Sequence, residues 1–170
     1  MALIIPLNNT EPKFGNNCWL APNATVVGDV VMGDECTVWF NAVVRGDVNS
    51  IRIGNKVNIQ DGAIIHCTYQ KAAVVIGSNV SIAHGAIVHG CNIHDNALIG
   101  MKAVVMDHAI VESNSLVAAG AIVLENTIIK SGEVWAGTPA KKIKELSPED
   151  FKFFIERTAN NYLMYAGWYK

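Results

Sequence analysis

The sequence predicts a mainly β fold, a parallel β-helix built from six-residue repeats and followed by a C-terminal α-helix. Three observations predict this class. Aliphatic residues return at every sixth position over much of the chain, small or turn-forming residues follow them, and helical spacing replaces this period after residue 146. We therefore expect two parts in the 170-residue chain: a β-helix over residues 1–146 and a helix over residues 147–170 packed on it.

The six-residue repeat is clearest in the middle of the chain. A period of six fits neither an amphipathic helix nor a flat strand, whose periods are about 3.6 and 2. It does fit a triangular solenoid, in which three short strands make a coil of roughly 18 residues and one aliphatic side chain per strand is buried by stacking. The repeating positions are Ile76, Ile82, Val88, Ile93, Ile99, Val105, Val111, Val117, Val123, Ile129 and Trp135.

The segment between Ile65 and Ile76 breaks this rhythm and leaves two registers open. If it is one repeat with a bulge, His66 and His89 stack on the same side of adjacent coils. If the segment contains two repeats, one of them shortened by one residue, His66 shares a side with His84 instead. In either register the slot after an inward residue points outward.

The C-terminal helix has a defined start. Ser147 is a suitable N-cap, Pro148 a suitable first helical residue, and Glu149 and Asp150 place acids in the first turn. We expect the segment 135–140 to close the last coil. The helical apolar face comprises Phe151, Phe154, Ile155, Ala159, Tyr162 and Leu163.

Composition excludes several classes. With 51% hydrophobic and 16% charged residues the chain is not disordered, and its net charge of −2 predicts no nucleic-acid or anionic-membrane partner. The N-terminus lacks a basic signal-peptide region, and no apolar stretch approaches the roughly 20 residues of a membrane span. We expect a soluble, cytoplasmic protein. Four dispersed cysteines form no C-x-x-C pair, which argues against a zinc ribbon.

Three of the five histidines, His66, His84 and His89, fall within roughly one coil and occupy outward slots. Neutral imidazole binds zinc and similar metals, and three histidines leave one coordination position open for chemistry. The same pattern is also compatible with ordinary surface histidines. His94 lies in a turn sequence.

The motifs R-x-D (45–47), Q-D-G-x-x-x-H (60–66) and A-H-x-x-x-x-H (83–89) occur in this order. Together with the exit AGTPAKKIKEL and the helix, they make the chain resemble the γ-class carbonic anhydrases over nearly its whole length. The resemblance implies a left-handed β-helix and a homotrimer with active sites between subunits. It implies that His66 and His89 of one subunit and His84 of its neighbour bind zinc, or iron or cobalt in some settings.

The resemblance also assigns polar neighbours. Arg45 and Asp61 would form an ion pair between subunits, and Asp47 and Gln60 would orient the bound water or bicarbonate. We expect these four residues to face outward and to be paired, because unpaired polar groups inside an aliphatic prism are costly. Tyr162 matches a tyrosine that several relatives bring near the metal, although its helical spacing favours an aromatic residue packed toward the core.

The implied activity is a zinc-dependent carbonate dehydratase, a lyase in which a metal-bound hydroxide hydrates CO2 to bicarbonate. The family's proton-relay glutamates are missing: Val48 stands at one position, and the loop CTYQKAA has no acid at the other. We therefore expect low or buffer-assisted activity. Two alternatives stay open: an acyltransferase or thioesterase of the hexapeptide-repeat type, and a non-catalytic metal-binding trimeric scaffold.

Overall fold

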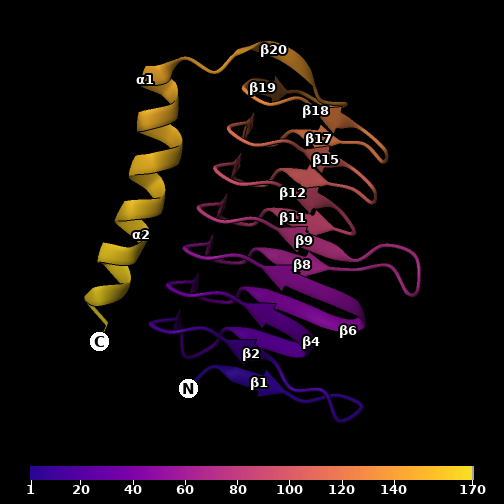
Figure 1. Ribbon diagram of the computed structural model, residues 1–170, viewed down its shortest axis with the longest axis vertical. Helices are drawn as coiled ribbons and strands as arrows, with labels where there is room; N and C mark the ends of the chain where they lie inside the picture. The colour runs from indigo at the N-terminus through magenta and orange to yellow at the C-terminus, as the bar shows by residue number, and fades with distance from the viewer. Residues whose placement is uncertain (170) are drawn as a thin grey trace.

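The computed structural model, which describes residues 1–169, is a left-handed solenoid of short parallel strands with a helix running along one side (Figure 1). The predicted fold class is therefore confirmed. Each strand is short because a six-residue repeat must supply both a strand and a corner. The strands are Leu3–Ile5 (β1), Lys13–Phe14 (β2), Trp19–Leu20 (β3), Thr25–Met32 (β4), Thr37–Val38 (β5), Val43–Ile53 (β6), Asn58–Ile59 (β7), Ile64–His66 (β8), Val74–Ile76 (β9), Ser81–Ile82 (β10), Ile87–His89 (β11), Asn92–Ile93 (β12), Leu98–Ile99 (β13), Val104–Val105 (β14), Ile110–Val111 (β15), Leu116–Val117 (β16), Ile122–Val123 (β17), Ile128–Ile129 (β18), Glu133–Ala136 (β19) and Lys141–Glu145 (β20).

The strands stack as three sides of a prism. One side is the ladder β20-β19-β16-β13-β10-β7-β5-β3. The other two sides belong to a single sheet, because the long strand β6 passes from one side to the next: its first half pairs with β8 and its second half with β9. At the exit, β20 turns back antiparallel to β19 and pairs with it, so the strand on the last coil is Lys141–Glu145, which follows the segment 135–140 expected to close it.

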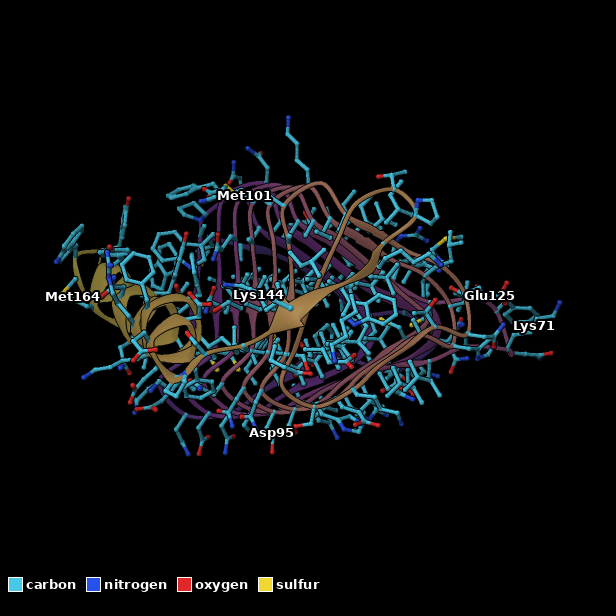
Figure 2. The ribbon with its side chains drawn as sticks, turned by 90° about the horizontal axis from the view of Figure 1, so that it is seen from above. Lys71, Asp95, Met101, Glu125, Lys144 and Met164 are labelled. Carbon is cyan, nitrogen blue, oxygen red and sulfur yellow. The ribbon has the colours of Figure 1, made fainter. Side chains whose placement is uncertain are left out.

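The register through the irregular segment 66–76 is that of one repeat with a bulge. Ile65 pairs with Val88, and Ile76 pairs with Ile53 of the preceding coil. The additional residues form a loop closed by a bridge between Thr68 and Ala72, and Lys71 at its tip projects from the side opposite the helix (Figure 2). His66 and His89 are therefore register partners, and the register that paired His66 with His84 is wrong.

The core is the predicted stack of aliphatic side chains. Ile82, Val88, Ile99 and Val105 are all 0% exposed, as is most of the series. Trp135 is an exception, since it lies on the last coil and is only partly buried. The corners carry many non-glycine residues with positive φ, most of them asparagines, which tolerate this conformation better than most other residues. The free thiols Cys36, Cys67 and Cys91 are buried, whereas Cys18 is half-buried.

The C-terminal helix begins at the predicted cap, where the Ser147 hydroxyl accepts a hydrogen bond from the Asp150 backbone N–H at 3.0 Å. It runs through Pro148–Asp150 (α1), a π-helical segment Phe151–Glu156 (η1) and Arg157–Gly167 (α2); residue 170, in the expected range, lies outside the described residues. Ile155 and Ala159 pack inward as expected.

Phe154 departs from the expected helical face, because it is 42% exposed. It lines an open cleft between the helix and the solenoid instead of packing in the core. Within residues 1–169, no helix has the length and apolar character needed to cross a membrane.

Candidate active site

Two histidines meet on the outer surface of one side of the prism. His66 ends β8 and His89 ends β11, directly opposite each other on adjacent coils. The Nδ1 atom of His66 lies 3.2 Å from the Nε2 atom of His89. Since the preceding residues, Ile65 and Val88, point into the core, the strand alternation directs both imidazoles outward.

A carboxylate contacts the other ring nitrogen of each imidazole. Asp47 Oδ1 lies 3.0 Å from His66 Nε2, and Asp107 Oδ1 lies 2.5 Å from His89 Nδ1. Partial burial alone would raise the pKa of both carboxyl groups. Hydrogen bonds outweigh it, from Arg45 and His66 for Asp47 and from Thr68 and His89 for Asp107, so both pKa values lie below the ordinary one. Both groups are therefore acceptors at neutral pH.

The third histidine belongs to a different cluster. His84 lies at the corner before β11, so the length of that strand separates it from His89. Its Nδ1 atom lies 3.0 Å from Asp61 Oδ2, and the Tyr162 hydroxyl lies 3.2 Å from its Nε2 atom. The His84 side chain is 48% exposed and therefore accessible from outside the chain.

Tyr162 reaches this cluster from α2. Its ring also packs edge-on against Trp39 with centroids 5.1 Å apart, so it serves as a packed aromatic residue and as a neighbour of His84. Burial, reinforced by the negative charge of Asp61, raises the pKa of Tyr162 to about 12. The hydroxyl therefore stays protonated at neutral pH and can donate a hydrogen bond to the imidazole.

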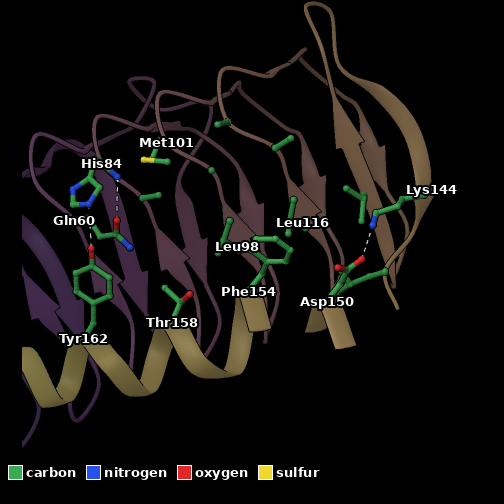
Figure 3. Close-up of a pocket in the computed structure, with 16 residues that line it drawn as sticks. Gln60, His84, Leu98, Met101, Leu116, Lys144, Asp150, Phe154, Thr158 and Tyr162 are labelled. Atoms are coloured by element: carbon green, nitrogen blue, oxygen red, sulfur yellow. Dashed lines mark hydrogen bonds and ion pairs between the residues drawn. The ribbon is translucent and has the colours of Figure 1, made fainter. Parts of the chain in front are cut away.

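Gln60 faces away from the core, as expected, but its side chain is only 3% exposed because the C-terminal helix covers it. It lies under the helix beside Tyr162 and His84 (Figure 3). Its amide is paired: Nε2 donates to Asn58 Oδ1 at 2.9 Å, and Oε1 accepts from the His84 backbone N–H at 3.2 Å. Burial is tolerated because both ends of the amide have partners.

Arg45 is paired within its own chain. Its guanidinium donates to Asp47 Oδ2 at 2.5 Å, so Asp47 bridges Arg45 and His66. Asp61, the partner that the resemblance assigned to Arg45, contacts His84 at the other end of this side of the prism. The four polar residues thus divide between two clusters: Arg45 and Asp47 lie with His66, and Gln60 and Asp61 lie with His84.

Sequence reasoning missed Asp107 and Thr68. The Thr68 hydroxyl donates to Asp107 Oδ2, whose other oxygen contacts His89. The available signal was the coil length, since Asp107 follows His89 by 18 residues, which is one turn of the solenoid. Nothing in the local sequence distinguishes this aspartate from the many other turn residues.

An apolar cleft of about 500 Å³ lies between the helix and the solenoid. Leu98, Met101, Leu116 and Phe154 contribute to its walls, and the His84–Tyr162 contact lies at one end (Figure 3). At the opposite end, the Lys144 ammonium pairs with Asp150 Oδ2 at 2.5 Å.

The separation of the two histidine nitrogens suits a metal ion, but the set of ligands within one chain is incomplete. Two ligands of a tetrahedral zinc ion, each about 2.0–2.1 Å from it, lie about 3.3 Å apart, close to the separation of the His66 and His89 nitrogens. However, the described part of a single chain, residues 1–169, contains no group of three or more histidine, cysteine or acidic side chains placed to hold a metal.

The chain is similar to proteins of known family. The model of the bacterial transferase hexapeptide family, with six repeats, matches residues 11–46 and 90–125. A carbonic anhydrase of Geobacillus kaustophilus is 39% identical over 99% of this chain and 91% of its own length. The mitochondrial γ carbonic anhydrase 2 of Arabidopsis thaliana is 40% identical over 92% of this chain, which spans only 58% of that relative.

Among solved structures, a hexapeptide transferase family protein from Anaplasma phagocytophilum superimposes with a TM-score of 0.94. It is 36% identical, and the alignment covers 99% of this chain and 98% of that one.

Proposed function

This chain belongs to the γ carbonic anhydrase family of hexapeptide-repeat proteins, and we propose that it is a zinc-dependent carbonic anhydrase active as a homotrimer. In this proposal, His66 and His89 of one subunit share a zinc ion with His84 of the neighbouring subunit. The substrate is CO2 and the product bicarbonate. Iron or cobalt could replace zinc in the same ligand set, and we expect the protein to act in the cytoplasm.

The observation that carries the proposal is the approach of one ring nitrogen of His66 to one ring nitrogen of His89, at 3.2 Å, while the other nitrogen of each ring contacts a carboxylate. A neutral imidazole has one N–H and one lone pair. An ionised carboxylate can only accept, so Asp47 and Asp107 place the N–H groups on His66 Nε2 and His89 Nδ1. The inner nitrogens, 3.2 Å apart, then present two lone pairs to each other. This arrangement is repulsive unless a cation lies beside both atoms, and a metal ion is such a cation.

The position of His84 supports a site shared between subunits. Within residues 1–169 its imidazole contacts Asp61 and Tyr162, and its side chain is about half exposed. In this proposal, the third nitrogen ligand for the His66–His89 pair comes from another copy of the chain. When bound, the zinc ion would supply a water of lowered pKa, which is the nucleophile that CO2 hydration needs.

The remaining residues of the site orient the histidines. Arg45 holds Asp47, which in turn fixes the His66 ring. Gln60 fixes the backbone of His84 from beneath the helix. Val48 packs against the core and cannot relay a proton, and Tyr69, in the loop after His66, is exposed to solvent. Proton release therefore depends on buffer, and we expect slow hydration without it.

The test combines metal analysis of the purified protein with stopped-flow CO2 hydration in the presence and absence of imidazole buffer. We expect stoichiometric zinc, hydration accelerated by imidazole, and loss of both after chelation. His84→Ala and His89→Ala should each lose zinc, whereas His94→Ala, an exposed histidine outside both clusters, should retain it.

Mixing His84→Ala with His89→Ala subunits provides a further test. Some interfaces of the mixed trimers combine intact ligands from both chains and should regain zinc. Full zinc in His84→Ala alone would refute the shared site, and bound zinc without hydration under any buffer would refute the carbonic anhydrase activity.

The apolar cleft favours acyl chemistry as a second candidate function. Its volume of about 500 Å³ and its wall of Leu98, Met101 and Phe154 suit an acyl chain, and His84 lies at its end. A thioester acyl group bound there would place its carbonyl near an imidazole. Hydrolysis or transfer of medium-chain acyl-CoA, lost in His84→Ala and weakened in Met101→Trp, would favour this function; no turnover of any acyl-CoA would exclude it.

A further inference from the structure

We propose that Asp107, held by Thr68 and accommodated by Gly90, is a positioning residue that fixes the tautomer and orientation of His89. Its carboxylate keeps the N–H of His89 on Nδ1, so that Nε2 presents its lone pair toward His66. The inference rests on the proposed role of His89 as a metal ligand.

Both oxygens of Asp107 are engaged by side chains from preceding coils. Oδ1 contacts His89 Nδ1 at 2.5 Å, and Oδ2 accepts from the Thr68 hydroxyl. The Asp107 side chain is only 21% exposed. Two donors at the two oxygens leave the carboxylate plane little freedom, and the His89 ring is correspondingly restrained from turning about its χ2 angle.

Other aspartates at the corners of this solenoid have a different role. Asp34 Oδ1 accepts from the Asn16 backbone N–H at 2.6 Å, and Asp95 Oδ1 accepts from the Ser78 backbone N–H at 2.7 Å. Both satisfy the corner of the preceding coil. Within residues 1–169, by contrast, the Asp107 carboxylate forms its hydrogen bonds with the side chains of Thr68 and His89. Asp107 therefore binds the histidine side chain, whereas Asp34 and Asp95 bind backbone groups of a turn.

Gly90 leaves the space that the carboxylate needs. A Cβ atom at this position would lie 2.5 Å from Asp107 Oδ1 and 2.7 Å from Ala72 Cβ, both closer than real Cβ atoms approach. Gly90 also has φ of +55°. The absent side chain next to a ligand histidine thus allows Asp107 to approach the ring nitrogen.

The chemical consequence concerns which nitrogen carries the proton. With the carboxylate at Nδ1, the Nδ1–H tautomer gains a charge-assisted hydrogen bond that the Nε2–H tautomer cannot make. Without the Asp107 carboxylate, His89 Nε2 can carry the proton and donate toward His66 Nδ1. The lone pair of His89 Nε2 is then no longer available to a metal. Partners of this kind in the outer shell of metal sites are typically worth 10–100-fold in metal affinity.

The experiment compares the wild type with Asp107→Ala, Asp107→Asn and Thr68→Val, and uses Asp95→Asn as the matched control at a turn carboxylate. One readout is the ¹⁵N shift pattern of His89 in the metal-free protein at alkaline pH, which reports the tautomer. The other is zinc affinity against a competing chelator.

We expect the Nδ1–H tautomer in the wild type, a shift toward Nε2–H in Asp107→Ala, and zinc binding weakened by about 10–100-fold. Thr68→Val should weaken zinc binding by less. Asp107→Asn retains an acceptor but loses its charge, so its Nδ1–H population should lie between those of the wild type and Asp107→Ala. If Asp107→Ala does not fold, a wild-type population in Asp107→Asn would overturn the proposal. Asp95→Asn should match the wild type.

An unchanged His89 tautomer in Asp107→Ala, or wild-type zinc affinity in that variant, would overturn the proposal. The tautomer readout needs no metal, so it also separates this inference from the proposed function. A wild-type protein that binds no zinc would refute the metalloenzyme, and the ¹⁵N pattern would still decide whether Asp107 positions His89.

Discussion

Gly90→Ala tests the space beside His89 by adding a single methyl group. Two penalties are expected. An alanine at a φ of +55° adopts the left-handed region, which costs roughly 1–2 kcal/mol for a non-glycine residue. Its Cβ would also meet Asp107 Oδ1 at 2.5 Å, so the carboxylate must move away from His89.

Gly120→Ala separates these two penalties. Gly120 has a similar φ of +68°, but an added Cβ there would meet nothing within 4 Å. Gly120→Ala should therefore lose only the free energy of unfolding that the left-handed backbone conformation costs, about 1–2 kcal/mol. Gly90→Ala adds the weakening of a hydrogen bond to a charged group, about 1.5–3 kcal/mol. It also brings the new methyl group within 2.7 Å of Ala72 Cβ. The difference between the two variants should therefore be at least about 2 kcal/mol.

Urea unfolding of both variants at one protein concentration measures this difference, because the stability of an oligomer depends on its concentration. Zinc affinity measured in parallel should fall in Gly90→Ala and stay unchanged in Gly120→Ala. Equal free energies of unfolding for the two variants would refute the reasoning, because the added methyl group would then fit beside the Asp107 carboxylate without displacing it.

Two further predictions concern cysteine reactivity and the helix cap. A hydrogen bond from the Cys36 thiol is the main cause that lowers the pKa of Cys18 to about 7, whereas burial raises that of Cys91 to about 12. Because the thiolate is the nucleophile, iodoacetamide labelling of Cys18 in the folded protein should rise with pH and level off above about 7, with Cys91 unlabelled; mass spectrometry showing no plateau would contradict this. Ser147→Ala removes the acceptor for the Asp150 N–H and should cost about 1 kcal/mol, measured as a lower melting temperature; an unchanged value would show that the cap contributes nothing.

The fold could be predicted because its signal is a period. An aliphatic residue at every sixth position has one solution that buries all of them, and Ile82, Val88 and Ile99 are indeed fully buried. The start of the C-terminal helix was equally predictable, since Ser147 and Pro148 act through local backbone geometry. The π-helical segment at 151–156 was not, because no local sequence rule specifies it.

The residues of the candidate site could be predicted only in part. Histidine, arginine and aspartate motifs identified His66, His89 and Asp47, but the loop after His66 left their register undecided. The structure decides it by pairing Ile65 with Val88, and it shows that the C-terminal helix covers the outward-facing Gln60. Asp107 carried no local signal because its neighbours His89 and Thr68 lie 18 and 39 residues away in sequence.

The sequence by itself determined the solenoid, the capped helix and the identity of the histidines, because each depends on residues close together in the chain or on a repeated spacing. Only the tertiary structure decided that His66 and His89 meet at 3.2 Å, that Asp47 and Asp107 contact their outer nitrogens, and that His84 lies in another cluster with Asp61 and Tyr162. The physical reason is that stacking brings together residues a whole coil apart, and a single bulged loop shifts which of them meet.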